Sequence, residues 1–236
     1  MSNSEKRFEA ENVFCIRGER QVFSGLSFSL ATGGGLILRG PNGSGKSSLL
    51  RILAGFLKPV GGNLGWNDVD PQEAPEVHRA RTHYVGHMEA IKPNLTVDEH
   101  LAFWARAKGF KRPADNILQA LDLDLLADVP GRFLSAGQKR RLSLTRLLAT
   151  PADLWLLDEP SVTLDVQSTA RLEDILAAHR ASGGMAIVAT HAEIALPGAK
   201  VIDMAGYRIA SDALLGLPQK ASGEPTAAGV PDYGEW

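Results

Sequence analysis

The glycine-rich stretch RGPNGSGKSS, residues 39–48, constrains the fold of this chain more than any other segment. It follows a short apolar run and precedes residues 47–56, whose apolar positions recur at helical spacing. A buried strand, a loop and a helix are therefore expected in that order. From Gly40 onward the stretch has the P-loop pattern, in which backbone N–H groups and the helix N-terminus bind phosphate. It predicts a nucleoside triphosphate site, without indicating which process the nucleotide drives.

Within this loop the expected roles divide between the backbone and two side chains. Lys46 is expected to reach the β- and γ-phosphates of ATP, and the hydroxyl of Ser47 is expected to ligate Mg²⁺. The ATP-binding residues predicted from the loop are Gly40, Pro41, Asn42, Gly43, Ser44, Gly45, Lys46, Ser47 and Ser48.

An apolar strand that ends in two acidic residues forms the second part of the predicted site. In LWLLDEP the strand ends at Asp158, the carboxylate expected on the Mg²⁺ side, with a water between it and the ion. Glu159 follows directly and is predicted to be the base that deprotonates the attacking water. An apolar run followed by Asp-Glu is common on its own, but beside a P-loop it indicates ATP hydrolysis.

Composition limits the class of protein. Of the 236 residues, 44% are hydrophobic and 22% are charged, as in soluble globular domains, and the net charge of −2 does not favour nucleic acid as a partner. The single cysteine, Cys15, is expected to be a small core residue in a reducing compartment. The N-terminal segment lacks the apolar region of a signal peptide, and no apolar run approaches the ~20 residues that span a bilayer. Any membrane part is therefore expected on another chain.

The spacing of apolar residues predicts an α/β fold, in which strands alternate with helices. The segment from about 87 to 140 has a helical pattern and is expected to form a helical subdomain within a domain covering 1–212. Residues 213–236, rich in Pro, Gly, Ala and Ser, are expected to be a loosely ordered tail. The expected strands are 8–16, 26–30, 36–39, 82–86, 153–160 and 185–190, with a turn at 61–63, a helix at 166–180, a short helix after 190 and a closing hairpin at 200–209.

A third motif narrows the nucleotide site to one superfamily. LSAGQKRR, residues 134–141, resembles the LSGGQ signature of ATP-binding cassette (ABC) proteins. The resemblance covers roughly 8–210 and implies an ABC-type P-loop NTPase with a RecA-like core, an N-terminal antiparallel β subdomain and an inserted α-helical subdomain. It also implies that the signature binds the γ-phosphate of ATP on a second cassette, with a homodimer expected. The signature residues are Ser135, Ala136, Gly137 and Gln138, and Ser135 is also a favoured helix N-cap.

The same resemblance assigns two further positions and shows two departures. Asp165 corresponds to the D-loop aspartate, and His191, after a buried strand, corresponds to the switch histidine that senses the γ-phosphate. Arg17 stands where an aromatic residue usually stacks on adenine, and a guanidinium plane can also stack on a base. His87 stands at the position of the Q-loop glutamine, where it is a candidate to bind a water or the metal shell.

Those departures point to one family. Arg17 within RGERQVFSGLSF, His87 within YVGHMEAIKPNLTVDEHLAFWA, and FLSAGQKRRLSLTRLL together resemble the CcmA family, the ATP-binding subunits of haem-exporter-type ABC complexes of cytochrome c maturation. The resemblance implies a peripheral ATPase on the cytoplasmic face of a bacterial inner membrane, docked on integral membrane subunits. ATP hydrolysis there supports haem delivery to, or release of, a periplasmic haem chaperone. Haem is not expected to bind this chain directly.

Other readings of the sequence stay open. An ABC ATPase for another cargo has the same motifs, because selectivity lies in the membrane chains. A soluble ABC protein of translation or DNA repair is disfavoured, since the chain has one P-loop and no sustained heptads over 57–133. The basic run Lys139–Arg141 is expected to be a solvated first turn of the signature helix rather than a nucleic-acid patch.

Overall fold

The computed structural model describes residues 6–18, 20–67, 69–111 and 116–207, and it has the predicted α/β fold. The strands are β1 (Arg7–Arg17), β2 (Arg20–Ala31), β3 (Gly35–Arg39), β4 (Gly61–Trp66), β5 (Thr82–Val85), β6 (Leu154–Asp158), β7 (Met185–Ala189) and β8 (Lys200–Asp203). The α-helices are α1 (Lys46–Leu53), α2 (Pro75–Arg81), α3 (Val97–Ala107), α4 (Ile117–Ala120), α5 (Ala136–Ala149) and α6 (Val166–Ala181). Short 3₁₀ turns occur at Asp124–Leu126, Gly131–Phe133 and Met204–Tyr207.

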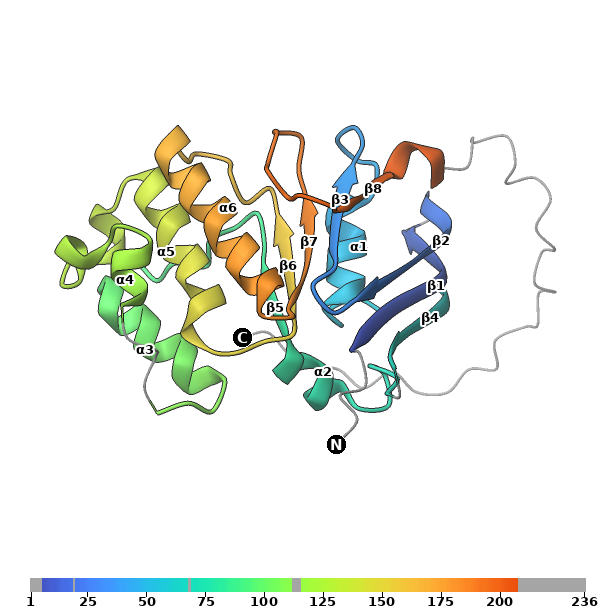
Figure 1. The fold of residues 1–236 in the computed structure, drawn as a ribbon, viewed down its shortest axis with the longest axis horizontal. Coiled ribbons are helices and arrows are strands. Elements are labelled where there is room, and N and C mark those ends of the chain that lie inside the picture. Colours follow the sequence, from blue (N-terminus) through green and yellow to red (C-terminus); the bar gives the residue numbers. More distant parts are fainter. Residues whose placement is uncertain (1–5, 19, 68, 112–115, 208–236) are drawn as a thin grey trace, which may run out of the picture.

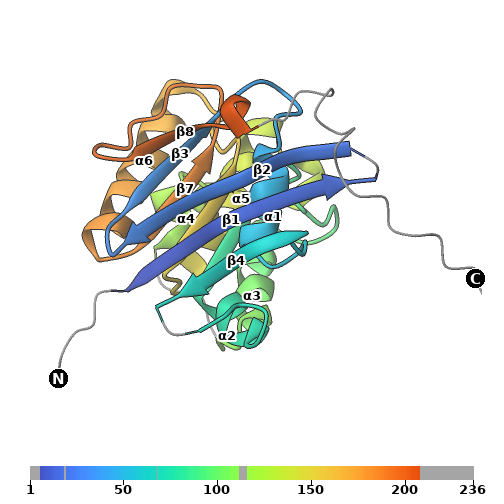
Figure 2. The ribbon, with the colours of Figure 1, turned by 90° about the vertical axis from the view of Figure 1, so that its right-hand side faces the viewer.

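An antiparallel sheet forms one side of the molecule, with strand order β2-β1-β4 (Figure 2). The strands β1 and β2 contain the two predicted N-terminal strands, and each is longer than predicted. The turn expected at 61–63 is wrong: these residues begin β4, in which Asn63 pairs with Glu11 and Trp66 with Phe8 of β1. Two consecutive glycines favour a turn locally, but pairing with a long neighbouring strand keeps this segment extended.

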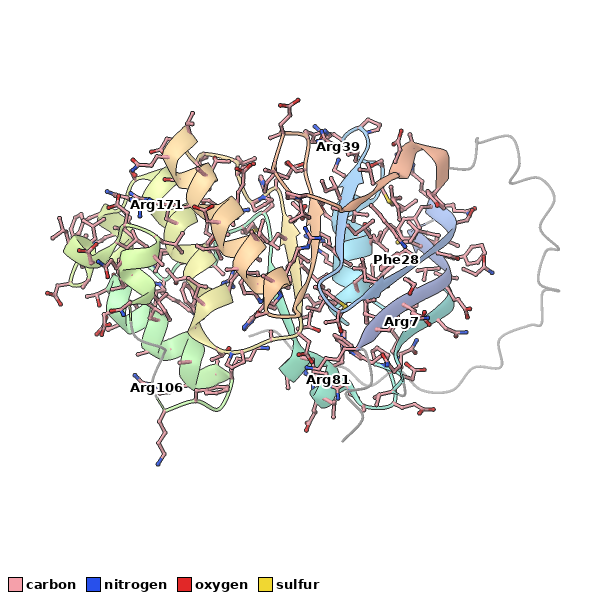
Figure 3. The ribbon with its side chains drawn as sticks, in the orientation of Figure 1. Arg7, Phe28, Arg39, Arg81, Arg106 and Arg171 are labelled. Carbon is pink, nitrogen blue, oxygen red and sulfur yellow. The ribbon has the colours of Figure 1, made fainter. Side chains whose placement is uncertain are left out.

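A parallel sheet forms the centre, with strand order β5-β6-β7-β3-β8. Helix α1 lies between the two sheets (Figures 1 and 2) and buries Leu49, Leu50, Ile52 and Leu53. These side chains share a core with Phe8 of β1, and Phe28 of β2, labelled in Figure 3, packs against the same core. Because α1 is held by both sheets, the loop that precedes it is anchored on each side.

The other face of the parallel sheet is covered by helices, with α3 to α6 on the far side from the antiparallel sheet (Figure 1). A second core joins Leu142 of α5 and Leu172 of α6 to Leu157 of β6. No helix among the described residues is long and apolar enough to cross a membrane. The boundaries expected for the helical subdomain, 87–140, and for the whole domain, 1–212, stay predictions.

The C-terminal side differs from the expected arrangement after β7. The short helix expected after residue 190 is absent from the described residues 191–199, where Pro197 and the left-handed Gly198 (φ 70°) do not favour a helix. Instead of starting a hairpin, β8 pairs in parallel with β3, and Met204–Tyr207 turns as a 3₁₀ helix. The rest of the expected hairpin and the tail at 213–236 lie outside the described residues. Cys15 is a buried free thiol, as predicted.

Two histidines beside β6, His83 buried and His179 half-buried, predict how stability depends on pH. His83 of β5 is 7% exposed and its Nε2 lies 2.9 Å from the carbonyl of Thr150, while the ring of His179 stacks on Trp155 with centroids 3.7 Å apart. Burial lowers the pKa of each imidazole to about 4 from the ordinary value of 6.5. As the pH falls, the histidines of the unfolded chain therefore take up protons before those of the folded chain. The stability that depends on these two neutral imidazoles is fully present above pH 6.5 and is lost as the pH falls towards 4.

We expect urea unfolding at pH 7.5, 6 and 5 to show a steady fall in the free energy of unfolding, by roughly 2 kcal/mol for each histidine at pH 5. His179→Phe keeps a ring on Trp155 but cannot titrate, so its pH dependence should be shallower. If the free energy of unfolding of His179→Phe fell with pH as steeply as that of the unchanged chain, His179 would not be a source of the pH dependence.

Candidate nucleotide-binding site

The P-loop links β3 to α1, and glycine is required at two of its positions. Gly45, the N-cap of α1, has φ 101°, and a Cβ there would lie 2.7 Å from Cγ1 of Val22 and 2.8 Å from Cδ1 of Phe23. Gly40 has φ 133°, and its Cβ would lie 2.9 Å from Oγ of Ser44. A side chain at either position would combine backbone strain with a clash. The loop is thus held in a single tight path between two sheets.

Lys46 lies at the start of α1 and is 6% exposed. Its Nζ donates hydrogen bonds to the carbonyls of Gly40 at 2.7 Å and Pro41 at 3.3 Å, and lies 2.8 Å from Nε2 of His191. Burial lowers the pKa of its ammonium, while the carboxylates of Glu159 and Asp158 act in the opposite direction. A cation with these neighbours is positioned at the centre of the predicted site.

The predicted acidic pair lies at the end of β6. Because β3, β6 and β7 are parallel neighbours, their carboxyl ends meet at one edge of the sheet, with Leu38 opposite Ala189 and Asp158 opposite Ala189 (Figure 1). Asp158 is 2% exposed. The carboxylate of Glu159 accepts a hydrogen bond from the backbone N–H of His191 at 3.2 Å and lies 3.6 Å from its Nε2. The chain at the end of β6 and just after β7 therefore places the carboxylates of Asp158 and Glu159 and the imidazole of His191 at one edge of the sheet.

A cavity of about 560 Å³ connects these groups. Arg17 and His87, the two departures noted in the sequence, both line it. His191 is not among the lining residues, but it contacts two of them: its Nε2 lies 2.8 Å from Oδ1 of Asn42 and 2.8 Å from Nζ of Lys46. The roles of Arg17 and His87 stay predictions, but their placement agrees with the positions expected for them. The lining residues are Arg17, Arg20, Val22, Asn42, Gly43, Ser44, Gly45, Lys46, Ser47, Ser48, His87, Asp158 and Glu159.

The signature residues do not line this cavity. Ser135 is exposed at the N-cap of α5, where its Oγ accepts from the N–H of Gln138 at 3.2 Å and the Gln138 side chain accepts from the N–H of Ser135 at 2.8 Å. Ala136 is exposed too, and a Cβ on Gly137 would lie 3.1 Å from the carbonyl of Thr163. These four residues form a capped helix start that lies outside the nucleotide cavity of their own chain.

The D-loop aspartate also caps a helix. Asp165 is the N-cap of α6, and its Oδ1 accepts from the N–H of Ser168 at 2.7 Å. Hydrogen bonds from Ser168 hold the pKa of the Asp165 carboxyl below its ordinary value. Its role as the D-loop aspartate stays a prediction.

The basic run after the signature is not the solvated turn that was expected: Arg140 is buried, and Lys139 and Arg141 are only partly exposed. Arg140 is 2% exposed and donates to the carbonyls of four residues, and Arg141 is tied to Asp122. Helical periodicity could not reveal this, because α5 is buried on several sides, including Ser143 and Thr145. Three consecutive basic residues in the first turns of a helix ordinarily suggest a solvent-facing segment.

Comparisons with known proteins agree with this geometry. A family model described as ABC transporter matches residues 23–162. A cytochrome c biogenesis ATP-binding export protein CcmA of Paramagnetospirillum magneticum is 53% identical over 89% of this chain and 99% of its own length. The CcmA of Rhodospirillum rubrum is 56% identical, covering 83% of this chain and 84% of its own.

Solved structures support the fold. An ATP-binding subunit of an ABC transporter superposes with a TM-score of 0.71 at 24% identity, covering 78% of this chain and 79% of that one. A putative ABC transporter ATP-binding protein from Pyrococcus furiosus gives a TM-score of 0.74 at 22% identity, over 86% of this chain and 100% of that one. A dimeric cassette structure bound to ADP and Pi gives 0.68 at 24% identity, over 78% and 88%. At these identities the likeness concerns the fold alone.

Proposed function

The chain belongs to the CcmA family of ABC transporter ATP-binding proteins, and on that premise we propose that its ATP hydrolysis drives haem delivery to, or release of, a periplasmic haem chaperone. As a member of that family it is an ATP-binding component of a cytochrome c biogenesis export system, and its ATPase activity is coupled to transport. The ATPase assignment is carried by one observation: the P-loop, Asp158, Glu159 and His87 line a single cavity. The haem cargo is supported by the relatives' names.

The residues of the cavity suit the separate steps of hydrolysis. The loop N–H groups and Lys46 would hold the phosphates, and Arg17 would stack on the base at the open end. Glu159 would accept a proton from the attacking water, and His191, which contacts both Glu159 and Lys46, would hold that water against the γ-phosphate.

Magnesium fits the oxygen donors that are present. The hydroxyl of Ser47 and the carboxylate of Asp158 line the same cavity, and hard oxygen donors are what Mg²⁺ prefers. No group of three or more acidic, histidine or cysteine side chains among the described residues forms a cage for a metal. A cation held by few protein ligands and by phosphate is the usual arrangement for Mg²⁺. When bound, the ion would neutralise charge on the phosphates.

A second copy of the chain is the expected partner of the signature. Because Ser135 and Ala136 are exposed and lie outside the cavity of their own chain, they are free to approach the γ-phosphate held by another cassette. The N-terminus of α5 carries free N–H groups and a positive dipole end, which suit a phosphate. Two such contacts, related by a two-fold axis, would enclose two nucleotides.

A groove beside β5, separate from the nucleotide cavity, suits docking of a membrane subunit at the cytoplasmic face of the inner membrane. It has a volume of about 660 Å³ and lies between the core and the helices α3 and α5. Phe56 is 62% exposed there and makes an edge contact with Tyr84, with ring centroids 5.4 Å apart. Trp104 and the stem of Lys108 also line it. An exposed aromatic ring in a groove with half-buried aromatic neighbours is typical of a protein interface.

The proposed function predicts the phenotype of a strain that lacks this chain. We expect loss of c-type cytochromes, measured by haem staining of membrane proteins, and recovery with the unchanged gene. Lys46→Ala should not restore them, since nucleotide binding is lost. Phe56→Lys should also fail, although it keeps ATP hydrolysis, because the groove loses its apolar ring.

The control for the groove is Val201→Lys. Val201 is 61% exposed, close to the 62% of Phe56, but it lies on the edge strand β8, where lysine is well tolerated. It should restore cytochromes fully. A deletion strain that keeps all its c-type cytochromes would overturn the haem proposal and leave the ATPase assignment in place.

A further inference from the structure

Arg140 makes a set of contacts that the predicted mechanism does not use. It lies in the second turn of α5, buried at 2% exposure, and its guanidinium donates to four backbone carbonyls. The acceptors are Gly86 at 2.9 Å, Asp158 at 2.9 Å, Glu159 at 2.7 Å and Pro160 at 3.0 Å. Arginines such as Arg7 and Arg106, in contrast, extend from the surface (Figure 3). A buried planar fork of donors fixes several acceptors relative to one another.

The four acceptors belong to two segments that are remote in the sequence. Gly86 begins the loop after β5 that carries His87, and the other three mark the end of β6 and the start of the D-loop. Arg140 itself belongs to the helix that Ser135 caps. A single side chain therefore connects the signature helix to both loops that supply acidic and imidazole groups to the nucleotide cavity.

The backbone of Glu159 depends on outside support. Its φ of 48° lies in the left-handed region, which a residue with a side chain adopts only when its surroundings hold it there. The N–H of Glu159 donates to the carbonyl of Ala189 at 2.8 Å. Its own carbonyl accepts from Arg140 at 2.7 Å and, over the longer distance of 3.3 Å, from the N–H of Val162. Arg140 thus holds one of the two backbone groups that fix this conformation, while the side chain of Glu159 faces the cavity.

We propose that Arg140 is a positioning residue for hydrolysis: it holds Glu159 so that its carboxylate faces the nucleotide cavity, and it links that conformation to the placement of the signature helix. The proposal rests on Glu159 being the base proposed above. Arg140 is not among the residues that line the cavity, so its effect falls on turnover and not on ATP affinity. Movement of α5 upon contact with a second cassette would be transmitted directly to the base.

The charges around Arg140 agree with this role. Burial lowers the pKa of its guanidinium from the ordinary value, and the smaller opposing effects come from Glu89, Asp158, Glu159 and Tyr84, which favour the charged form. Removing the guanidinium would take one donor from each of four carbonyls and would leave that of Glu159 with the N–H of Val162 at 3.3 Å. A hydrogen bond lost from a buried carbonyl is costly. The loop after β6 would then relax from its left-handed conformation, taking Glu159 with it.

The neighbouring arginine provides a matched control. Arg141 follows on the same helix, but its guanidinium donates in the other direction, to the carbonyls of Leu121 at 3.1 Å and Asp122 at 2.8 Å and to the Asp122 carboxylate at 2.8 Å. Arg141→Gln removes a guanidinium from α5 without touching Glu159. Any loss caused only by weakening this helix should appear in both variants.

The test measures steady-state ATP hydrolysis and equilibrium binding of MgATP for the full-length chain. Arg140→Gln should lower kcat about 10–100-fold, because a displacement of about 1 Å at the base costs this much, while the Kd for ATP changes less than about threefold. Arg140→Lys keeps a buried cation that reaches fewer carbonyls, so its kcat should lie between that of Arg140→Gln and that of the unchanged chain. Arg141→Gln should leave kcat within about threefold. Thermal unfolding identifies any variant that fails to fold, and Arg140→Lys then carries the comparison.

A double-mutant cycle separates positioning from general damage. If Arg140 acts through Glu159, adding Arg140→Gln to Glu159→Gln should lower the residual turnover by less than about twofold, since the base is already absent. Multiplicative losses would overturn the proposal, as would a fall in ATP affinity as large as the fall in kcat. Full turnover in Glu159→Gln alone would instead overturn the proposed base.

Discussion

Glu159→Gln is expected to bind ATP as tightly as the unchanged chain while hydrolysing it about 10²–10⁴-fold more slowly. The substitution is nearly isosteric, and the glutamine oxygen can still accept from the N–H of His191, as the carboxylate does at 3.2 Å. Lys46 keeps its carbonyl partners in the loop, so the phosphate-binding groups stay in place. Only the ability to take a proton from water is removed, and this ability contributes to the hydrolysis step alone.

The measurement pairs steady-state hydrolysis with equilibrium binding of MgATP. Glu173→Gln is the control, because Glu173 also accepts from a backbone N–H, that of Ala195 at 2.6 Å, but lies on α6 outside the nucleotide cavity. It should hydrolyse ATP at the normal rate. Turnover in Glu159→Gln within about threefold of the unchanged chain would remove Glu159 as the base and would point to another group near His191.

Much of the candidate site could be predicted because its parts follow parallel strands. The P-loop follows β3, Asp158 ends β6, and His191 follows β7. The carboxyl ends of parallel strands meet at one edge of the sheet, independently of the segments that connect the strands. The motifs and their order were therefore enough to place these groups together. Arg17 required more, since it lies at the end of β1 in the other sheet, and only the family resemblance placed it beside the loop.

The parts that could not be predicted depend on contacts between remote segments. Residues 61–63 have the composition of a turn, yet β1 offers them an unpaired edge and they extend along it as β4. Arg140 has the local context of an exposed basic residue, yet its acceptors arrive from loops at 86 and at 158–160. Neither outcome is encoded in the periodicity of its own segment. Both follow from what the rest of the fold leaves unpaired.

Ser135→Asp is expected to bind ATP but to lose hydrolysis by about 10²-fold or more, because in the proposed dimer the new carboxylate would face the γ-phosphate of the partner's nucleotide. Aspartate is as good an N-cap as serine, so α5 keeps its start, where Ser135 accepts from Gln138. Ser135→Asn also keeps the cap but adds no charge, and it should retain most of the activity. This pair separates repulsion of phosphate from loss of the helix cap.

Mixing two inactive variants tests whether the site is shared between chains. Lys46→Ala disables the phosphate-binding side of a cassette and Ser135→Asp disables its signature side, so a mixed dimer holds one site in which both sides are intact. With random assembly half of the dimers are mixed, and activity should recover to about a quarter of the unchanged level if the two sites act independently. If each signature served the P-loop of its own chain, every site in the mixture would carry a defect and nothing would recover. Recovery on mixing would therefore place Ser135 at the γ-phosphate of a second cassette. Ser135 is free to make that contact because it is exposed and lies outside the nucleotide cavity of its own chain.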